Sequence, residues 1–270
     1  MATFSQRQPV IFLPHGGGPC FFMDWSWGPA DTWHATGEFL ASLAGTLPEP
    51  PHAILAVTAH WEATGFEASG AARPDLIYDY SGFPEHTYQL TWPAPGEPVL
   101  ASRAVNLLAA AGLPSRVHPT RGFDHGVFVP LKVAFPRAEI PTVALSLDRR
   151  LDPAAHLAAG RALAPLRDEG VLIVASGMSF HNLHAYFRPE TLLASRAFDQ
   201  WLTETAGLPG PERAARLTAW RQAPYGEFSH PREEHLIPLM VAAGAAGDAM
   251  GRRVFHDEPM GAALSAYRFD

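Results

Sequence analysis

The stretch Ile54-Leu55-Ala56-Val57-Thr58-Ala59-His60-Trp61 decides the fold of this chain. It is a short apolar run with several β-branched residues, which predicts a buried strand, and it ends in a histidine instead of a turn residue. In an open α/β sheet, ligands bind at the carboxyl ends of the strands. The stretch therefore predicts a buried strand with a chemically active side chain at the edge where a ligand would bind.

The same pattern recurs along the chain, where short apolar runs alternate with longer segments of helical periodicity. This alternation is typical of an α/β fold with a largely parallel central sheet and helices on both faces. The expected strands are residues 10–13, 54–58, 142–147 and 171–175, and the expected helices are residues 30–47, 97–112, 127–135, 152–168, 190–206, 211–221 and a segment that starts at Pro231.

Two regions depart from this alternation. Residues 66–95 carry glycine, proline and aromatic residues without clean periodicity, which predicts an irregular excursion with short strands over one end of the sheet. Residues 253–255 and 265–269 are expected to add edge strands. No internal repeat or low-complexity linker divides the 270 residues, and 47% of them are hydrophobic, so we expect one catalytic domain over residues 1–270.

The composition narrows the possible partners. The formal net charge is -7, and no basic run is longer than the pairs Arg149-Arg150 and Arg252-Arg253, so nucleic acid and anionic membrane surfaces are not expected partners. The longest weakly polar stretch, residues 236–247, is shorter than the roughly 20 residues that cross a bilayer. The single cysteine, Cys20, excludes an internal disulfide and suits a cytoplasmic location. The sequence carries no signal of oligomeric state.

Five of the 13 histidines share a setting, because each lies at the end of an expected strand or at the start of a helix. Histidine is the commonest metal ligand and the side chain best suited to proton transfer near neutral pH. If the sheet forms as expected, all five converge on one crevice and predict a metal site, an acid–base site or both. These residues are His15, His60, His125, His181 and His235.

A serine esterase of the α/β-hydrolase type is the alternative. His15-Gly16-Gly17-Gly18 after a strand resembles an oxyanion loop, and Gly177-Met178-Ser179-Phe180 resembles the first part of a nucleophile elbow with Ser179 as the nucleophile. The elbow requires a small residue two positions after the serine, where this chain has His181. The other strand-end histidines would also have no role in a catalytic triad. The hydrolase therefore ranks second.

The histidines lie in five blocks that span nearly the whole chain. The blocks are Leu13-Pro14-His15-Gly16-Gly17-Gly18-Pro19, Thr58-Ala59-His60-Trp61, Gly122-Phe123-Asp124-His125-Gly126-Val127-Phe128-Val129-Pro130-Leu131, Ser176-Gly177-Met178-Ser179-Phe180-His181-Asn182-Leu183 and His230-Pro231-Arg232-Glu233-Glu234-His235-Leu236-Ile237-Pro238-Leu239. Together, and in this order, they resemble the signature blocks of the DODA-type (4,5-DOPA dioxygenase-like) extradiol aromatic ring-opening dioxygenases, which belong to the class III extradiol family.

This resemblance implies a non-haem metal enzyme that cleaves a small aromatic diol with O2. It implies that His15, His60 and His235 are the metal ligands, that His181 is the catalytic acid/base, and that His125 contacts the substrate or dioxygen. Fe(II) is the metal expected for activity. The usual facial set is two histidines and a carboxylate, whereas three histidines are also a catalytic zinc set, so Zn(II) is the second candidate and Glu234 is a fallback ligand.

Substrate contacts are the least specified feature. Phe180, Phe123 and Arg232 lie within the blocks and are candidates for substrate binding. Further aromatic residues near the blocks, including Tyr80 and Phe83, can line an aromatic pocket. A third alternative is a non-catalytic member of the family that uses the metal site for partner recognition, although such a protein would not need both His125 and His181.

Overall fold

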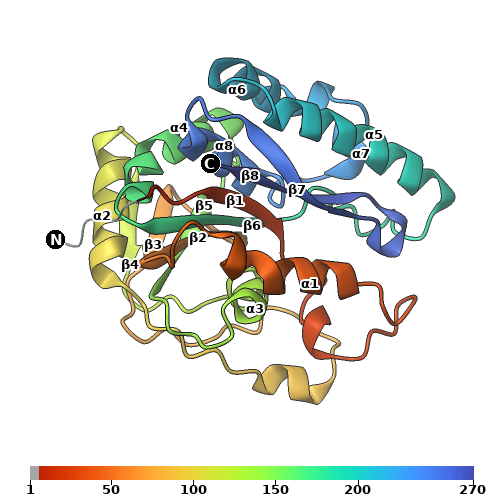
Figure 1. The fold of residues 1–270 in the computed structure, drawn as a ribbon, viewed down its shortest axis with the longest axis horizontal. Coiled ribbons are helices and arrows are strands. Elements are labelled where there is room, and N and C mark those ends of the chain that lie inside the picture. The colour runs from red at the N-terminus through yellow and green to blue at the C-terminus, as the bar shows by residue number, and fades with distance from the viewer. Residues whose placement is uncertain (1–5) are drawn as a thin grey trace.

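The computed structural model describes residues 6–270, so residues 1–5 of the expected domain 1–270 lie outside the described residues. An eight-stranded sheet runs through it in the order β4-β3-β5-β2-β6-β1-β8-β7 (Figure 1). The central pairs β5–β2, β2–β6 and β6–β1 are parallel, which confirms the expected α/β class. The strands are β1 Val10–Pro14, β2 Ala53–Ala63, β3 Phe66–Ser69, β4 Ser115–His118, β5 Thr142–Asp148, β6 Val171–Gly177, β7 Gly251–Asp257 and β8 Leu264–Phe269.

Helices cover both faces of the sheet (Figure 1). One face packs against α1 His34–Ser42 and α3 His125–Ala134. The other face shares its core with α2 Pro98–Ala110, α4 Pro153–Leu163, α5 Pro189–Ala206, α6 Gly210–Thr218 and α8 Ile237–Ala246. Shorter elements are α7 Gly226–Ser229 and the 3-10 helices Cys20–Phe22, Leu43–Thr46, Glu85–Gln89, Ala164–Arg167, Trp220–Gln222 and Pro259–Gly261.

The central strands are buried on both faces. In β1, Val10 and Phe12 belong to the core on the α4 and α8 side, whereas Ile11 and Leu13 belong to the core on the α1 and α3 side. Successive side chains of a strand point to opposite faces, so a strand covered on both sides must be apolar at every position. This is why the sequence shows continuous apolar runs in the central strands.

Two helix starts follow from capping residues. Asp152 accepts the main-chain N–H of Ala155 at 2.7 Å and Pro153 follows it, so α4 begins where the sequence predicts. Glu97 accepts the N–H of Val99 at the start of α2 in the same way. Each cap satisfies a backbone donor that the first turn leaves unpaired.

Several predicted boundaries are wrong. The helix predicted from Pro231 begins only at Ile237, because the N–H groups of Leu236 and Ile237 both donate to Glu233 O and close a turn first. The helix predicted over residues 30–47 is α1 followed by a 3-10 turn. The last strand, β8, is not at the sheet edge, since it pairs with both β1 and β7.

The strand β4 had no counterpart in the prediction. Its residues are only partly buried, so its sequence lacks the apolar run that marks the central strands. Within residues 6–270, no helix combines the length and the apolar character needed to cross a membrane.

Candidate metal centre

The carboxyl ends of β1 and β2 deliver two of the predicted histidines to one edge of the sheet. His15 follows β1 directly, and its N–H donates to Gly177 O at the end of β6. His60 lies inside β2, beyond the point where the register with β5 shifts between Val57 and Glu62. The shift frees His60 from regular pairing with β5. Its side chain is about one-fifth exposed, at 20%, and faces the other histidines.

His235 comes from the turn before α8 and reaches the same edge through a close backbone contact. Its carbonyl oxygen accepts the N–H of Met178 at 3.0 Å. A Cβ atom on Gly177 would lie 2.2 Å from this oxygen, so only glycine allows the turn to approach the end of β6. Gly177, two residues before the serine of the supposed nucleophile elbow, therefore serves to place His235.

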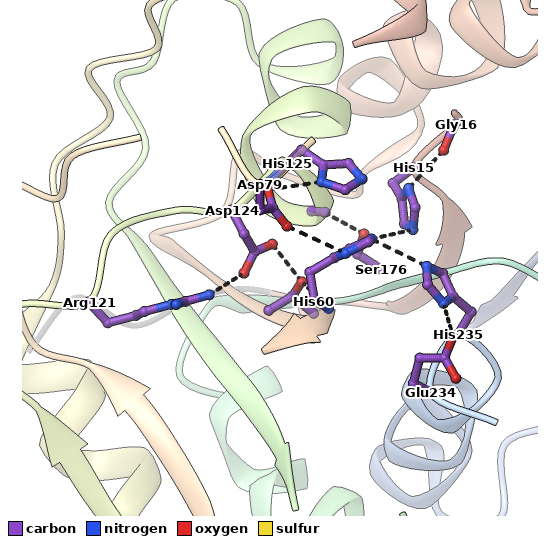
Figure 2. Close-up of polar contacts among 12 residues, drawn as sticks. His15, Gly16, His60, Asp79, Arg121, Asp124, His125, Ser176, Glu234 and His235 are labelled. Carbon is purple, nitrogen blue, oxygen red and sulfur yellow. Dashed lines mark hydrogen bonds and ion pairs between the residues drawn. The ribbon is translucent and has the colours of Figure 1, made fainter. Parts of the chain in front are cut away.

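The Nε2 atoms of these three histidines face one another (Figure 2). His60 Nε2 lies 3.3 Å from His15 Nε2 and 3.2 Å from His235 Nε2. Two imidazole nitrogens that bind one metal ion at about 2.1 Å each lie about 3.0–3.4 Å apart. The separations therefore fit a metal ion that is shared by His15, His60 and His235, and all three ligand atoms lie within 4.8 Å of one another.

The opposite nitrogen of each ring has a hydrogen-bond acceptor. Nδ1–H of His15 donates to Gly16 O at 2.9 Å, and Nδ1–H of His235 donates to Glu234 Oε1 at 2.9 Å. Nδ1 of His60 faces Asp79 Oδ2 at 3.5 Å. These partners fix the proton on Nδ1, which leaves the Nε2 lone pairs free to bind a metal.

Burial keeps the three rings neutral. It lowers the pKa of His15 and of His235 well below the ordinary value, and the neighbouring histidines lower both pKa values further. Burial and the nearby His125 lower the pKa of His60 to about 3, although Asp79 opposes the shift. Neutral imidazoles are the form that binds metals, so the cluster is ready to accept a cation at neutral pH.

His125 is the first residue of α3 and packs against His60, with ring centroids 3.9 Å apart. Its Nδ1–H donates to Asp79 Oδ1 at 2.9 Å, and its main-chain N–H donates to the same oxygen at 2.8 Å. A Cβ atom on Gly126 would lie 2.7 Å from Thr58 Oγ1 and 2.9 Å from His60 Cδ2, so glycine is required for α3 to start beside β2.

His181 lies in the loop after β6 and stacks on His235. The ring centroids are 3.4 Å apart and the planes are inclined by 20°. Nδ1 of His181 lies 3.2 Å from Glu234 Oε1, the same oxygen that His235 uses. The nearly parallel rings of His181 and His235 therefore share one anchor through their Nδ1 atoms.

Asp79 and Glu234, the carboxylates that face the histidine rings, have lowered pKa values. Burial tends to raise the pKa of Asp79, but its hydrogen bonds from His125 outweigh burial and lower the pKa overall. Burial likewise opposes ionisation of Glu234, and the hydrogen bond from His181 lowers its pKa overall. Glu234, the fallback ligand, lies on the Nδ1 side of His235 and therefore behind the ring that would bind the metal.

The residues predicted to bind substrate lie at the margins of the site. Phe123 and Phe180 are fully buried, and they pack against Trp92 and Tyr186, respectively. Arg232 donates to both carboxylate oxygens of Glu62 at 2.6 Å. A substrate role for these three residues stays a prediction, and the structure gives each of them a partner within the protein.

The serine of the hydrolase alternative is not presented as a nucleophile. Ser179 is 1% exposed, and its Oγ accepts the main-chain N–H of Ser265 at 2.8 Å. Its carbonyl oxygen accepts Nε2–H of His230 at 3.0 Å. The hydroxyl therefore joins the loop after β6 to β8 and faces the protein interior.

Asp79 contacts His125 and His60, and the sequence analysis missed it. An isolated bridge between Leu76 and Phe123 aligns its segment with the residues before α3, and Ile77 N–H donates to Phe123 O at 2.7 Å. The only signal in the sequence is a carboxylate between two tyrosines, Tyr78 and Tyr80, in a segment without periodicity. The position of Asp79 depends on the pairing of its segment with the residues before α3, which are distant in the sequence.

Comparisons with known proteins identify relatives of this chain. Residues 9–269 match the family model described as the catalytic LigB subunit of aromatic ring-opening dioxygenase. A "4,5-DOPA dioxygenase extradiol" of Beta vulgaris is 40% identical over 275 residues, which cover 100% of this chain and 99% of the relative. "Dioxygenase tasH" of Hapsidospora irregularis is 38% identical over 96% of this chain and 84% of its own length.

A solved structure shows the same fold. The crystal structure of uncharacterized protein JW3007 from Escherichia coli K12 superposes with a TM-score of 0.77 at 31% sequence identity, and the match covers 98% of this chain and 100% of that one. The family match and the solved structure both extend over nearly the whole chain. The chain therefore belongs to the family of catalytic LigB subunits of aromatic ring-opening dioxygenases, and it is an extradiol ring-cleavage dioxygenase with a histidine-rich metal site.

Proposed function

We propose that residues 1–270 form one cytoplasmic catalytic domain that opens the ring of a small catechol next to its two hydroxyl groups, with incorporation of both atoms of O2. One observation carries this proposal: three neutral imidazoles face one another through Nε2, and two further imidazoles, His125 and His181, pack directly against them. A site that only bound a metal would need the first three. The additional pair supports proton transfer and substrate contact.

His15, His60 and His235 would hold Fe(II) for activity, and the same set also suits Zn(II). When bound, the ion supplies Lewis acidity towards the diol hydroxyls and, as Fe(II), the redox chemistry that dioxygen requires. A set of three protein ligands would leave coordination positions for the substrate. The Nδ1 acceptors Gly16 O, Glu234 and Asp79 hold the rings in this arrangement.

His181 is the acid/base in this proposal. Its Nδ1 is anchored on Glu234, so Nε2 is the atom that exchanges a proton with the substrate. Nε2 takes a proton from the diol as the substrate binds and returns it as the ring opens, so the reaction consumes no net proton. His125 packs against His60, whereas His181 packs against His235. In this proposal, His125 donates or accepts a hydrogen bond at the oxygen atoms of the diol or of dioxygen.

A row of aromatic side chains reaches the site. The distance between ring centroids is 5.7 Å for Tyr80 and His125. It is 5.5 Å for Phe83 and Tyr80, and also 5.5 Å for Trp27 and Phe83. Trp27 is 53% exposed, so the row runs from solvent to the histidines. This row supports a planar aromatic substrate. The Beta vulgaris relative is named for 4,5-DOPA, which makes DOPA one catechol to test.

The test is anaerobic reconstitution of the metal-free protein with Fe(II), followed by a panel of catechols and then oxygen. We expect the yellow ring-opened semialdehyde from at least one catechol, and ring opening is expected to persist in a Ser179→Ala variant that folds. The absence of product with every catechol, together with ester hydrolysis that Ser179→Ala abolishes, would contradict the proposal. Zinc-loaded protein should bind catechol without opening the ring, because Zn(II) has no redox chemistry.

A further inference from the structure

Two carboxylates, Asp79 and Glu234, each contact two histidines of the candidate metal centre through Nδ1. Asp79 receives Nδ1–H of His125 at 2.9 Å on one oxygen, and its other oxygen faces Nδ1 of His60 at 3.5 Å. One carboxylate therefore contacts one ligand histidine and one histidine that is not a ligand. The main-chain N–H of His125 also donates to Asp79, which ties the carboxylate to the start of α3.

Glu234 repeats this arrangement with the second pair. Its Oε1 accepts from Nδ1 of His235 at 2.9 Å and lies 3.2 Å from Nδ1 of His181. The other oxygen, Oε2, lies 3.5 Å from Arg232 Nη1, and Arg232 is held in turn by Glu62. The ion pair behind Glu234 limits the positions that its carboxylate can adopt, so the stacked rings of His181 and His235 share one fixed anchor.

His15 differs from the other two ligands. Its Nδ1–H donates to a neutral acceptor, Gly16 O, and its ring is anchored by its own loop. A divalent cation held by three neutral imidazoles would keep its full charge, whereas a facial set with a carboxylate ligand removes part of it. Asp79 and Glu234 together carry two negative charges one hydrogen bond away from the ligands.

We propose that Asp79 and Glu234 are paired positioning residues, each of which orients one metal ligand and one substrate-facing histidine through Nδ1 and supplies the negative charge that a three-histidine site lacks. The proposal rests on the ligand assignment made under the proposed function. In this proposal Glu234 is not a metal ligand. It accepts a hydrogen bond from Nδ1 of His235, on the side of the ring opposite the metal-binding Nε2. The proposal also makes Asp79 the counterpart of Glu234 on the other side of the centre.

The test compares isosteric variants of the two carboxylates with matched controls. Asp79→Asn and Glu234→Gln remove one charge each, and Asp75→Asn and Glu227→Gln remove one charge from exposed carboxylates that make no contact with the five histidines in the described structure. The probe is Zn2+, and its affinity is measured by competition with a chelator. We expect Zn2+ to bind about 10- to 100-fold more weakly to Asp79→Asn and to Glu234→Gln, and with wild-type affinity to both controls.

A second readout distinguishes orientation from general stability. Long-range 1H–15N spectra of the zinc-loaded protein report which nitrogen of each imidazole carries the proton. Asp79→Asn should shift the His125 signals and spare those of His181, whereas Glu234→Gln should do the reverse, and the His15 signals should stay unchanged in both. Circular dichroism of the metal-free variants checks that they are folded. If either variant fails to fold, Asp79→Ser or Glu234→Ala replaces it in both measurements.

The outcomes separate this inference from the proposed function. Unchanged Zn2+ affinity in both carboxylate variants, or imidazole signals that do not move, would overturn the positioning roles even if the wild-type protein opens catechol rings. Weaker affinity with the expected shifts supports the positioning roles even if no catechol is opened. In that case only the proposed substrate class would fail.

Discussion

His181 stacks on His235 at a centroid distance of 3.4 Å, and both rings are anchored through Nδ1 on one oxygen of Glu234. The side chain that would move protons is therefore fixed against the side chain that would bind the metal. Any movement of one ring is passed to the other through the shared carboxylate. The pairing explains how a loop residue after β6 can be positioned as closely as a residue inside the sheet.

Substitution of His181 by Ala should remove turnover while the metal stays bound. A positioned general acid/base contributes about 10²- to 10⁴-fold to a rate, so kcat of the iron-loaded enzyme should fall by this factor. His15, His60 and His235 remain to bind the ion. The measurement is kcat together with metal content by mass spectrometry, and a stoichiometric loss of metal would instead make His181 a ligand.

Metal binding should stabilise the fold. A ligand present at about 1,000 times its Kd raises the free energy of unfolding by about 4 kcal/mol. We therefore expect a higher Tm in Zn2+ than in chelator, and a much smaller difference in His15→Ala, which loses one of the three nitrogens. The control is His34→Ala, an exposed histidine with its side chain 70% exposed, which should keep the wild-type difference. Equal Tm values with and without Zn2+ would argue against the site.

Gly126→Ala should damage the site and the fold together. The added Cβ would lie 2.7 Å from Thr58 Oγ1 and 2.9 Å from His60 Cδ2, so α3 or β2 must shift. Forcing an extra methyl group into a packed site costs about 1–3 kcal/mol, and the shift would move His60 away from the other ligands. Gly45→Ala is the matched control, because nothing lies within 4 Å of its Cβ position. Urea unfolding and Zn2+ affinity test this, and equal behaviour of the two variants would contradict it.

Acid stability should depend on His156, which lies in α4 away from the metal centre. The ring is fully buried, Nδ1–H donates to Asp152 O at 2.7 Å, and Nε2 accepts the N–H of Asp148 at 3.2 Å. Burial lowers its pKa below the ordinary value of about 6.5. Below that pH the unfolded chain binds a proton that the folded protein does not, so the free energy of unfolding falls as the pH decreases towards the folded-state pKa.

The variant His156→Gln removes this proton uptake. Its free energy of unfolding should therefore fall less steeply as the pH decreases below 6.5. The slope measures how many more protons the unfolded chain binds than the folded protein, and this number should be smaller by up to about one in the variant. Glutamine can still accept the N–H of Asp148. Urea titrations of the metal-free proteins at several pH values give the slopes. Identical slopes for the variant and the wild type would show that His156 does not contribute.

The central strands and the five histidines could be predicted because their signals are local. Burial on both faces leaves continuous apolar runs such as β6, and the neighbouring glycines mark the points where the chain turns at the sheet edge. His60 was placed at the end of its strand, whereas β2 continues to Ala63 past a register shift. A register shift depends on the partner strand, so the hydrophobic periodicity of one strand does not reveal it.

The positions of Asp79 and Glu234 could not be predicted from local sequence patterns. Glu234 was recognised only because it adjoins His235, and its place behind the ring could not be inferred from adjacency. Asp79 is brought to His125 by the bridge between Leu76 and Phe123, which joins segments 47 residues apart in the sequence. The start of α8 was misplaced for a related reason, since the turn at Glu233 is stabilised by the contact of His235 O with Met178.

The balance of charges at the centre has a consequence for what can enter it. In the proposed site, three neutral imidazoles, a bound divalent cation and the ionised Asp79 and Glu234 would sum to zero. An electroneutral centre attracts phosphate, sulfate and chloride weakly, because nothing offsets the cost of removing their water. A diol that arrives uncharged and gives up its protons inside the site avoids that cost. In the proposed site, the two carboxylates would therefore favour the entry of neutral aromatic diols over that of anions from the surrounding salt.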